Sequence, residues 1–411
     1  MARACTTTSH HGGFTLALAA TILTMAAASA PSLFYPQIAE RLGLLPVATT
    51  LVFAVYAFTL LAALLCLGSL SDRLGRRPVI ATGSLVLAAS LLLFWSAGSL
   101  AALLVARALQ GAAAGVLVPT MSAMLIDFEP PSRPGSAALW NTIGPMLGLA
   151  TGALGAAVLL DVTADPSLAV FGVLVTAFAT VAALVWATPE AVTRTRVRRG
   201  DLRPTFSVPP GVRPMLAAGV PAIVAGWATN GLFLALGTGL VGSELDGTTH
   251  TAAGVVISTL AIAGVLASRL LQRRTARTIS LYATSALALG TALSLAALAL
   301  HSYPAYVAAV AVVGSGFGTA FLGVLRTLMP ATQPSQRAAV MAVVYTVAYL
   351  AFGVPAIVAG LLVPVLTLAG TMTLLGAAIA VLAVIATILR VRIPDRNPDR
   401  AVREDPELRS P

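Results

Sequence analysis

Long apolar stretches alternate with short polar breaks along almost the whole chain. About 20 apolar residues cross the hydrocarbon core of a bilayer, and twelve of the stretches reach this length. Charged residues and clusters of Gly, Pro, Asp and Ser separate them. The pattern predicts twelve membrane-spanning helices, at 14–36, 47–70, 78–97, 100–126, 136–160, 167–188, 212–242, 250–271, 278–300, 303–329, 337–363 and 367–390.

The twelve stretches divide into two sets of six at a segment rich in arginine and proline. This segment buries too little apolar surface to fold alone, so we expect a solvated linker. The expected organisation is a cytoplasmic tail at 1–13, a six-helix bundle at 14–188, the linker at 189–211, a second six-helix bundle at 212–390 and a second cytoplasmic tail at 391–411.

The composition agrees with a membrane protein. Of the 411 residues, 58% are hydrophobic and 10% are charged, whereas about 25% are charged in an ordinary soluble domain. The mean hydropathy is +0.91. These values exclude a soluble fold and predict an all-α integral membrane protein.

The positions of the arginines predict the orientation. The chain has no lysine, and 22 of its 25 basic residues lie on one side if both termini are cytoplasmic. Arg41 lies on the other side, and Arg107 and Arg326 lie within predicted helices. Because short cytoplasmic loops are enriched in basic residues, we expect both termini inside. The basic charge then faces anionic lipid, and a linker without interleaved aromatic residues is not expected to bind nucleic acid.

The first apolar stretch has an alternative interpretation as a cleaved signal peptide. Arg3, the apolar run from Phe14 and the small residues at 26–30 fit that interpretation. The run continues to Tyr35, however, which is longer than the apolar region of a typical signal peptide. Its removal would also leave an odd number of helices, so we expect it to be a helix of the mature protein.

Two sequence features recur in both halves. The run Gly68–Arg77 is similar to the run at 264–273, at an offset of 196 residues, and Pro130 and Pro134 correspond to Pro330 and Pro334, at an offset of 200. Each pair follows the equivalent helix of its set. The sequence therefore predicts two parallel repeats related by an axis along the membrane normal.

With these features the chain resembles the major facilitator superfamily of transporters, in particular its twelve-span drug and metabolite efflux members. The run Gly68–Arg77 resembles the family's loop signature after the second helix. Arg107, Gln110 and Gly111 resemble its Arg-x-x-Gln-Gly signature in the fourth helix. The resemblance implies alternating access, with a substrate site between the halves.

The fifth predicted helix carries a partial antiporter signature. Its residues 144–148 resemble the glycine-proline core of that signature, but Trp140 and Leu149 replace residues that are more often glycine. Small residues four apart allow close helix packing, and proline kinks a helix. We expect a pivot and seal between the halves, and simple packing fits the glycines equally well; the residues are Asn141, Gly144, Pro145 and Gly148.

The loop after the second helix is expected to form a conformational latch. A carboxylate among arginines at a helix end can hold a neighbouring helix in one conformation. The resemblance implies that this charge relay stabilises the outward-facing arrangement. Alternatively, the arginines serve only as orientation anchors. The latch residues are Gly68, Asp72, Arg73, Gly75, Arg76 and Arg77.

Arg107 is the most informative single residue, because a charge within a membrane helix costs about 2.5–3.5 kcal/mol on insertion scales. All 15 acidic residues lie in predicted loops, tails or helix ends, so none is available to neutralise it. We expect Arg107 to face water, backbone carbonyls or substrate, and the resemblance implies a part in proton coupling. The alternative is that its side chain extends to the outer surface.

Aromatic and amide side chains in the helices that line the cavity of the resembling fold are the candidates for substrate binding. Such a lining suits an amphipathic ligand. The lack of a carboxylate in the helices and the presence of Arg107 favour a neutral or anionic compound. The candidates are Tyr35, Gln110, Trp140, Asn141, Trp227, Asn230, Phe233, Tyr345 and Tyr349.

Other classes of function have less support. The four histidines do not lie beside acids within a helix, so we expect no enzyme, metal or cofactor. The two cysteines give no disulfide framework or thiolate cluster. A channel would more often show rings of like charge, and a receptor would more often carry a folded signalling domain.

We therefore expect a transporter that exports a small amphipathic compound in exchange for protons. The alternatives are a pH-independent facilitator or importer and, with less support, a membrane receptor that does not transport. The expected partners are the substrate and the lipid bilayer, and one twelve-helix chain can act as a monomer. Alanine-rich helices and the use of arginine without lysine are compatible with a GC-rich bacterial genome, and hence with the bacterial inner membrane.

Overall fold

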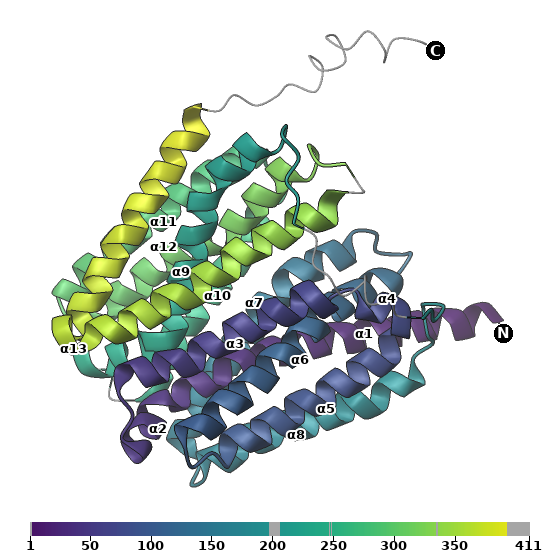
Figure 1. Cartoon of the computed structure of the whole chain (residues 1–411), viewed down its shortest axis with the longest axis horizontal. Helices are drawn as coiled ribbons and strands as arrows, with labels where there is room; N and C mark the ends of the chain where they lie inside the picture. The colour runs from purple at the N-terminus through teal and green to yellow at the C-terminus, as the bar shows by residue number, and fades with distance from the viewer. Residues whose placement is uncertain (1, 197–205, 246, 248, 334–335, 393–411) are drawn as a thin grey trace.

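A computed structural model describes residues 2–196, 206–245, 247, 249–333 and 336–392, and within them the chain forms helices and no strand (Figure 1). The predicted tail at 393–411 and the middle of the predicted linker, 197–205, lie outside the described residues. The elements are α1 (Ala2–Ser29), η1 (Ala30–Phe34), α2 (Tyr35–Leu42), α3 (Pro46–Leu67), α4 (Leu70–Leu74), α5 (Arg76–Trp95), α6 (Leu100–Asp127), α7 (Ser136–Val162), α8 (Pro166–Leu184), η2 (Val185–Ala187), α9 (Arg213–Glu244), α10 (His250–Leu271), α11 (Ala276–Ala299), α12 (Tyr303–Leu328) and α13 (Arg337–Arg392).

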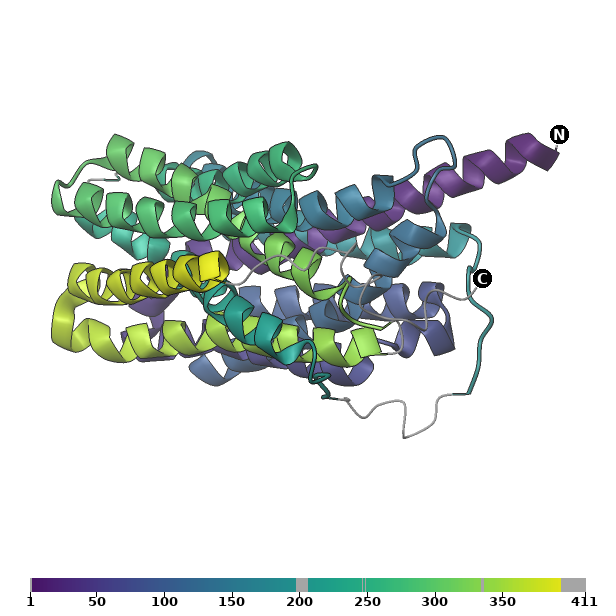
Figure 2. The ribbon, with the colours of Figure 1, turned by 90° about the horizontal axis from the view of Figure 1, so that it is seen from above.

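Eleven helical stretches of the described chain are long and apolar enough to cross a membrane. The last of them, α13, has 56 residues and changes direction at Thr367, whose backbone leaves the helical region at φ 63° and ψ 171°. Its two arms, 337–366 and 368–392, lie side by side in opposite directions (Figure 2). Each arm exceeds the roughly 20 residues that a crossing needs. The predicted break at 363–367 therefore falls within one bent element.

Residues that favour helix starts stand at the N-termini of most of these helices. Proline occupies the first position of α3, and the side chains of Ser99, Asp165 and Thr249 each accept a backbone N–H from the first turn of α6, α8 and α10. Such caps satisfy N–H groups that have no partner within the helix. The first helix differs from the prediction, because it begins at Ala2 and not at Phe14. No proline interrupts its N-terminal residues, so the helix continues through the stretch that we predicted as a tail.

The helices pack as two sets, α1–α8 and α9–α13 (Figure 1). In the first set, α6 packs against α1, α3 and α5, and α5 also packs against α8. In the second set, α9 packs against α12 and α13, and α11 packs between the same two helices. Two large contacts join the sets: α7 packs against α10, and α3 packs against α13. Smaller contacts join α9 to α3 and join η1 to α9 and α10.

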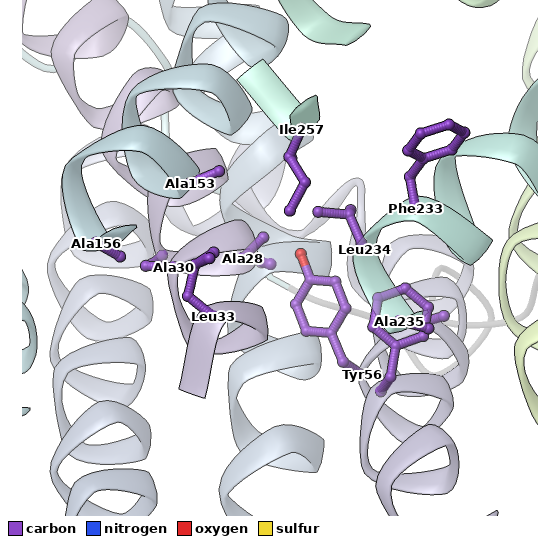
Figure 3. Close-up of a cluster of buried hydrophobic side chains, with 14 of the residues drawn as sticks. Ala28, Ala30, Leu33, Tyr56, Ala153, Ala156, Phe233, Leu234, Ala235 and Ile257 are labelled. Atoms are coloured by element: carbon purple, nitrogen blue, oxygen red, sulfur yellow. The ribbon is translucent and has the colours of Figure 1, made fainter. Parts of the chain in front are cut away.

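The two ends of the molecule differ in how the sets meet. We call them the Asp161 end, where α7 ends and α10 begins, and the Arg76 end, where α5 begins. A hydrophobic core shared by both sets includes Tyr56 of α3, Ala153 of α7 and Leu234 of α9, and its side chains interlock in Figure 3. A separate core near the Arg76 end consists of second-set residues such as Val212 and Leu328. The sets are therefore joined from the Asp161 end to the middle and have separate interiors near the Arg76 end.

Candidate functional site

The predicted latch residues form a charge network at the Arg76 end. Arg76 donates from Nη1 to Asp72 Oδ1 at 2.5 Å and from Nε to Asp127 Oδ2 at 3.0 Å. Nη1 also donates to the Ser71 hydroxyl at 2.7 Å, and Arg76 is 8% exposed. Because Asp72 lies on α4 and Asp127 ends α6, one buried guanidinium ties three helices of the first set together. The structure thus brings Asp72 and Arg76 into direct contact.

Glu190 is a member of this site that the sequence analysis missed. It follows α8 and reaches the N-terminus of α5, where Oε1 accepts the backbone N–H of Arg76 at 2.7 Å and Oε2 accepts that of Arg77 at 3.2 Å. A carboxylate there satisfies unpaired N–H groups and faces the positive end of the helix dipole. The start of the predicted linker is therefore attached to the latch.

Further contacts hold the linker and the latch together. The Thr195 N–H donates to the Arg73 carbonyl at 2.8 Å. Arg77 donates to the Trp186 carbonyl at 2.6 Å, and its guanidinium lies 5.1 Å from the centre of the Trp186 ring. Gly68 ends α3 by donating its N–H to the Leu64 carbonyl. The loop thus contacts the chain that connects the two sets.

Arg107 lies in the interior of the first set and has no exposed surface. It donates from Nη1 to Gln110 Oε1 at 2.7 Å and from Nη2 to the Tyr35 hydroxyl. Gln110 is held by donating from Nε2 to the Ala27 carbonyl at 2.7 Å. The alternative of a side chain that extends to the outer surface is therefore wrong, since neighbouring helices surround the guanidinium.

Aromatic rings enclose the charge of Arg107. The guanidinium carbon lies 5.3 Å from the centres of the Tyr35 and Phe94 rings and 5.6 Å from that of Tyr56. The faces of aromatic rings attract cations, most strongly where water is excluded. Among the described residues no carboxylate pairs with Arg107, and its Nε–H has no hydrogen-bond partner. The site is a buried cation held by phenol, amide and ring faces.

Gly111 sets the position of this cation. A side chain at Gly111 would overlap the Tyr56 carbonyl and the Thr59 hydroxyl on α3. Glycine therefore allows α6 to pack closely on α3, and this packing brings the Tyr56 ring to Arg107. In Figure 3 the Tyr56 hydroxyl points toward Leu234 and Ile257 of the second set. Tyr56, which the sequence analysis did not single out, thus contacts both Arg107 and the boundary between the sets.

The glycines of α7 do not occupy the place we expected. We predicted a seal between the halves, but Gly144 faces Leu18 and Thr21 of α1, and a side chain at Gly148 would overlap α1 at Met25. These glycines therefore pack within the first set, next to Pro145. Another face of α7 meets the second set, where Ala150 accepts a hydrogen bond from Ser258 of α10. Asn141 donates to the Ser122 carbonyl of α6 at 3.3 Å.

Three of the predicted cavity residues gather in one aromatic cluster. The Trp227 ring of α9 lies 4.9 Å from Tyr349 and 5.9 Å from Phe321, and Tyr345 lies 5.9 Å from Phe321. Phe352 joins the cluster at 6.0 Å from Trp227. The Trp227 Nε1–H is buried and makes no hydrogen bond with the described residues. We call Trp227, Phe321, Tyr345, Tyr349 and Phe352 the aromatic cluster.

The remaining cavity candidates lie elsewhere. Tyr35 belongs to the Arg107 site, and Trp140 packs partly buried against the shared core. Phe233 stacks on Tyr306 at 6.3 Å inside the second set. It lines a small cavity there, and Asn230 is buried on the same helix. The structure therefore does not bring the predicted residues into one pocket.

Residues 17–351 match a family model that is described as "Major Facilitator Superfamily". The chain belongs to the major facilitator superfamily. A solved structure of similar fold is that of a bacterial homologue of the human lysosomal transporter Spinster, in an inward-facing and occupied conformation. It aligns with a TM-score of 0.69 and 13% identity over 92% of this chain and 95% of that one.

Curated relatives of this superfamily member carry names that refer to drug resistance. The multidrug resistance protein MdtL of Shewanella oneidensis is 37% identical over 94 residues, which are 22% of this chain and 23% of the relative. A putative multidrug resistance protein MdtD of Escherichia coli is 32% identical over 123 residues, 29% of this chain and 26% of the relative. The matches span about a quarter of these relatives.

Proposed function

We propose that this protein is a secondary active transporter that exports a small amphipathic drug or metabolite by alternating access, in exchange for protons. The observation that carries the proposal is the difference between the two ends. The two sets share a core from the Asp161 end to the middle, whereas the second set has its own core near the Arg76 end. Such an arrangement suits rocking of one set against the other around a central site.

The proposed topology has twelve spans in two parallel six-helix repeats, with both termini in the cytoplasm. The two arms of α13 supply the last two spans, and the predicted division at 189–211 separates the repeats. The bias of arginine toward the Arg76 end supports a cytoplasmic location of that end. The conformation is then closed toward the outside and corresponds to an inward-facing state.

The aromatic cluster is the proposed contact for the substrate. Its rings supply flat apolar surface, and the Trp227 Nε1–H supplies an unpaired donor. A polar group buried without a partner is costly, so a ligand acceptor at Nε1 would be favoured. Because Arg107 has no exposed surface, it offers an anionic substrate no direct ion pair in this conformation. We therefore favour the neutral end of the expected range, an amphipathic molecule with a ring and a carbonyl or ether oxygen.

A facilitator that works without protons is the second candidate. The acidic side chains among the described residues lie in the short helices α2 and α4, at the ends of longer helices or in connections. No carboxylate of these residues lies midway along a span. A deep carboxylate is a common proton carrier in membrane transporters. The residues are Glu40, Asp72, Asp127, Glu129, Asp161, Asp165, Glu190 and Glu244.

Flux measurements in proteoliposomes distinguish the two candidates. A panel of amphipathic dyes and antibiotics is tested with an imposed pH gradient, with and without a protonophore, for the natural protein and for Asp72→Asn. Uphill movement that the protonophore abolishes and Asp72→Asn reduces supports the exporter. Downhill flux that is indifferent to pH supports the facilitator. Flux no greater than that of empty liposomes for every compound contradicts transport of this substrate class.

The proposed setting is the inner membrane of a bacterium, where the chain works as a monomer in contact with lipid. Exposed apolar side chains midway along the helices, such as Val173, Leu289 and Val381, fit contact with acyl chains at 61%, 58% and 59% exposure. An apolar surface of this kind needs a bilayer and not water.

A further inference from the structure

Asp161 of α7 covers the N-terminus of α10, a helix of the other set. Its Oδ1 accepts the backbone N–H of His250 at 3.0 Å, and its Oδ2 accepts the backbone N–H of Thr251 at 2.8 Å and the Thr251 hydroxyl at 2.5 Å. The first N–H groups of a helix have no partner within it and favour a negative charge. A single carboxylate thus caps a 22-residue helix across the boundary between the sets.

The His250 side chain adds a titratable group to this contact. Nδ1 lies 2.8 Å from Asp161 Oδ1, so Nδ1 carries a hydrogen and donates, since an ionised carboxylate only accepts. Nε2 lies 3.1 Å from the Gln37 side-chain amide on α2. The amide nitrogen donates to neutral Nε2, and a turned amide offers its oxygen to a protonated Nε2. Both states of the imidazole are satisfied, but only the protonated state places a cation beside Asp161.

Three of the other charged or titratable groups at this end have contacts of their own. Arg41 donates to the Ala97 carbonyl, Asp165 caps α8, and His301 Nδ1 lies against the Glu244 carbonyl. Asp161 is therefore the charged group that the described structure sets against His250. The neighbouring groups are Glu40 and Arg41 on α2, Asp165 before α8, Glu244 at the end of α9 and His301 after α11, and Asp246 lies outside the described residues.

We propose that His250 is a proton-binding site that holds the Asp161 end closed. The inference rests on the proposed alternating access, in which opening this end separates α7 from α10. The contact between imidazolium and carboxylate then exists only in the closed state, so the closed state binds the proton more tightly. By linkage, external protons favour closure, and a rise in external pH releases it.

The exposure of His250 indicates that it senses the external pH and does not carry protons across the membrane. Its side chain is 38% exposed in the closed state, so its proton exchanges with the external medium while the gate is shut. The site therefore reports external pH and does not move protons across the membrane. In an exporter that takes up protons from outside, it would favour the return to the inward-facing state when external protons are abundant.

A distance measurement tests the proposal without any substrate. Spin labels are attached at Leu168→Cys and Leu300→Cys, which are 52% and 76% exposed on opposite sets at this end, in a background in which Cys5 and Cys66 are serine. Double electron–electron resonance in nanodiscs measures the distance between the two labels, and the population at the longer distance gives the open fraction between pH 5.5 and 8.5. We expect that fraction to rise about threefold or more with pH. In His250→Asn, which retains an N–H donor but binds no proton, it should be constant.

A matched variant separates this site from the other histidine of the same end. His301→Asn should keep the pH response, because the contact of His301 lies within the second set. An unchanged pH response in His250→Asn, or a distance in the natural protein that is independent of pH, would overturn the inference. If no compound is transported but the pH response depends on His250, the gate stands and the proposed function fails.

Discussion

Gly75 and Glu190 share one small space at the start of α5. A Cβ placed at Gly75 would lie 2.5 Å from the Glu190 Oε2 atom, and Gly75 has a φ of +96° that side chains rarely adopt. The glycine thus provides both the backbone turn and the room for a carboxylate that comes from 115 residues later in the chain. This relationship explains why the latch contains a glycine between Leu74 and Arg76.

Removal of the Glu190 carboxylate should weaken the latch. We expect Glu190→Ala to cost about 1 kcal/mol, a usual value for a lost N-terminal cap, and to lower the thermal midpoint of the purified protein. Glu129→Ala is the matched control, because Glu129 accepts the Ala137 N–H at 2.8 Å at the start of α7, outside the latch. Both variants should lose similar stability, but only Glu190→Ala should also change the rate of transport. Equal transport rates in the two variants would contradict a role of Glu190 in the latch.

Substitution of Gly75 should reveal the shared space. Gly75→Ala meets both a backbone conformation open essentially only to glycine, at φ 96° and ψ 156°, and the overlap with Glu190, whereas Gly135→Ala meets only the milder cost of the left-handed region, with no atom within 4 Å of its Cβ. For Gly135 this backbone cost is about 1–2 kcal/mol. We expect Gly75→Ala to be the less stable variant in thermal denaturation. In a Glu190→Ala background Gly75→Ala should cost less than it does in the natural protein, and additive effects of Gly75→Ala and Glu190→Ala would argue against the overlap.

The geometry of Arg107 should matter as much as its charge. Arg107→Lys keeps a cation but loses the forked donor that reaches both Tyr35 and Gln110. We expect initial transport rates to fall about tenfold or more in both Arg107→Lys and Arg107→Ala, a loss of about 1.4 kcal/mol or more in transition-state terms. Arg326→Ala is the control, because Arg326 is exposed on α12 and donates to the Arg274 carbonyl. Normal rates in Arg107→Lys would show that charge alone suffices.

The unpaired indole donor gives a prediction about selectivity. Trp227→Phe retains a ring in the aromatic cluster and removes the Nε1–H. For substrates with a carbonyl or ether oxygen, we expect KM to rise about threefold to tenfold, the effect of one hydrogen bond. Substrates without an acceptor should be unaffected. Trp140→Phe, which alters a ring outside the cluster, should leave KM unchanged for both classes of substrate. An equal rise of KM in both variants and for both classes would exclude a specific hydrogen bond to Trp227.

The sequence predicted the helices well because each span carries its own signal. Apolar length and the breaks at charges and at clusters of Gly, Pro, Asp and Ser are local features, and they placed most helix ends within a few residues. The start of α1 was the exception, and the break predicted at 363–367 coincides with the kink at Thr367. At Thr367 the two arms join without an intervening loop, and no glycine or charge marks the turn.

The site was less predictable because its contacts join distant parts of the chain. Asp72 and Arg76 are four residues apart and could be paired from sequence, but Glu190 reaches them from beyond α8. Likewise, the glycine spacing of α7 indicates close packing but not which neighbour is packed, and that neighbour is α1. The glycine at position 75, directly before the helix start, was the one hint in the sequence of an unusual turn there.

The connections at the Asp161 end are very short. Three residues, 43–45, separate α2 from α3, three more, 163–165, separate α7 from α8, and the arms of α13 meet at Thr367 alone. An antibody fragment raised against this end would therefore have to recognise helix ends and not loops as its epitope. Because α7 and α10 each contribute to that surface, a fragment that bridges them would bind one conformation, and it could serve as a reagent that traps the transporter in that state.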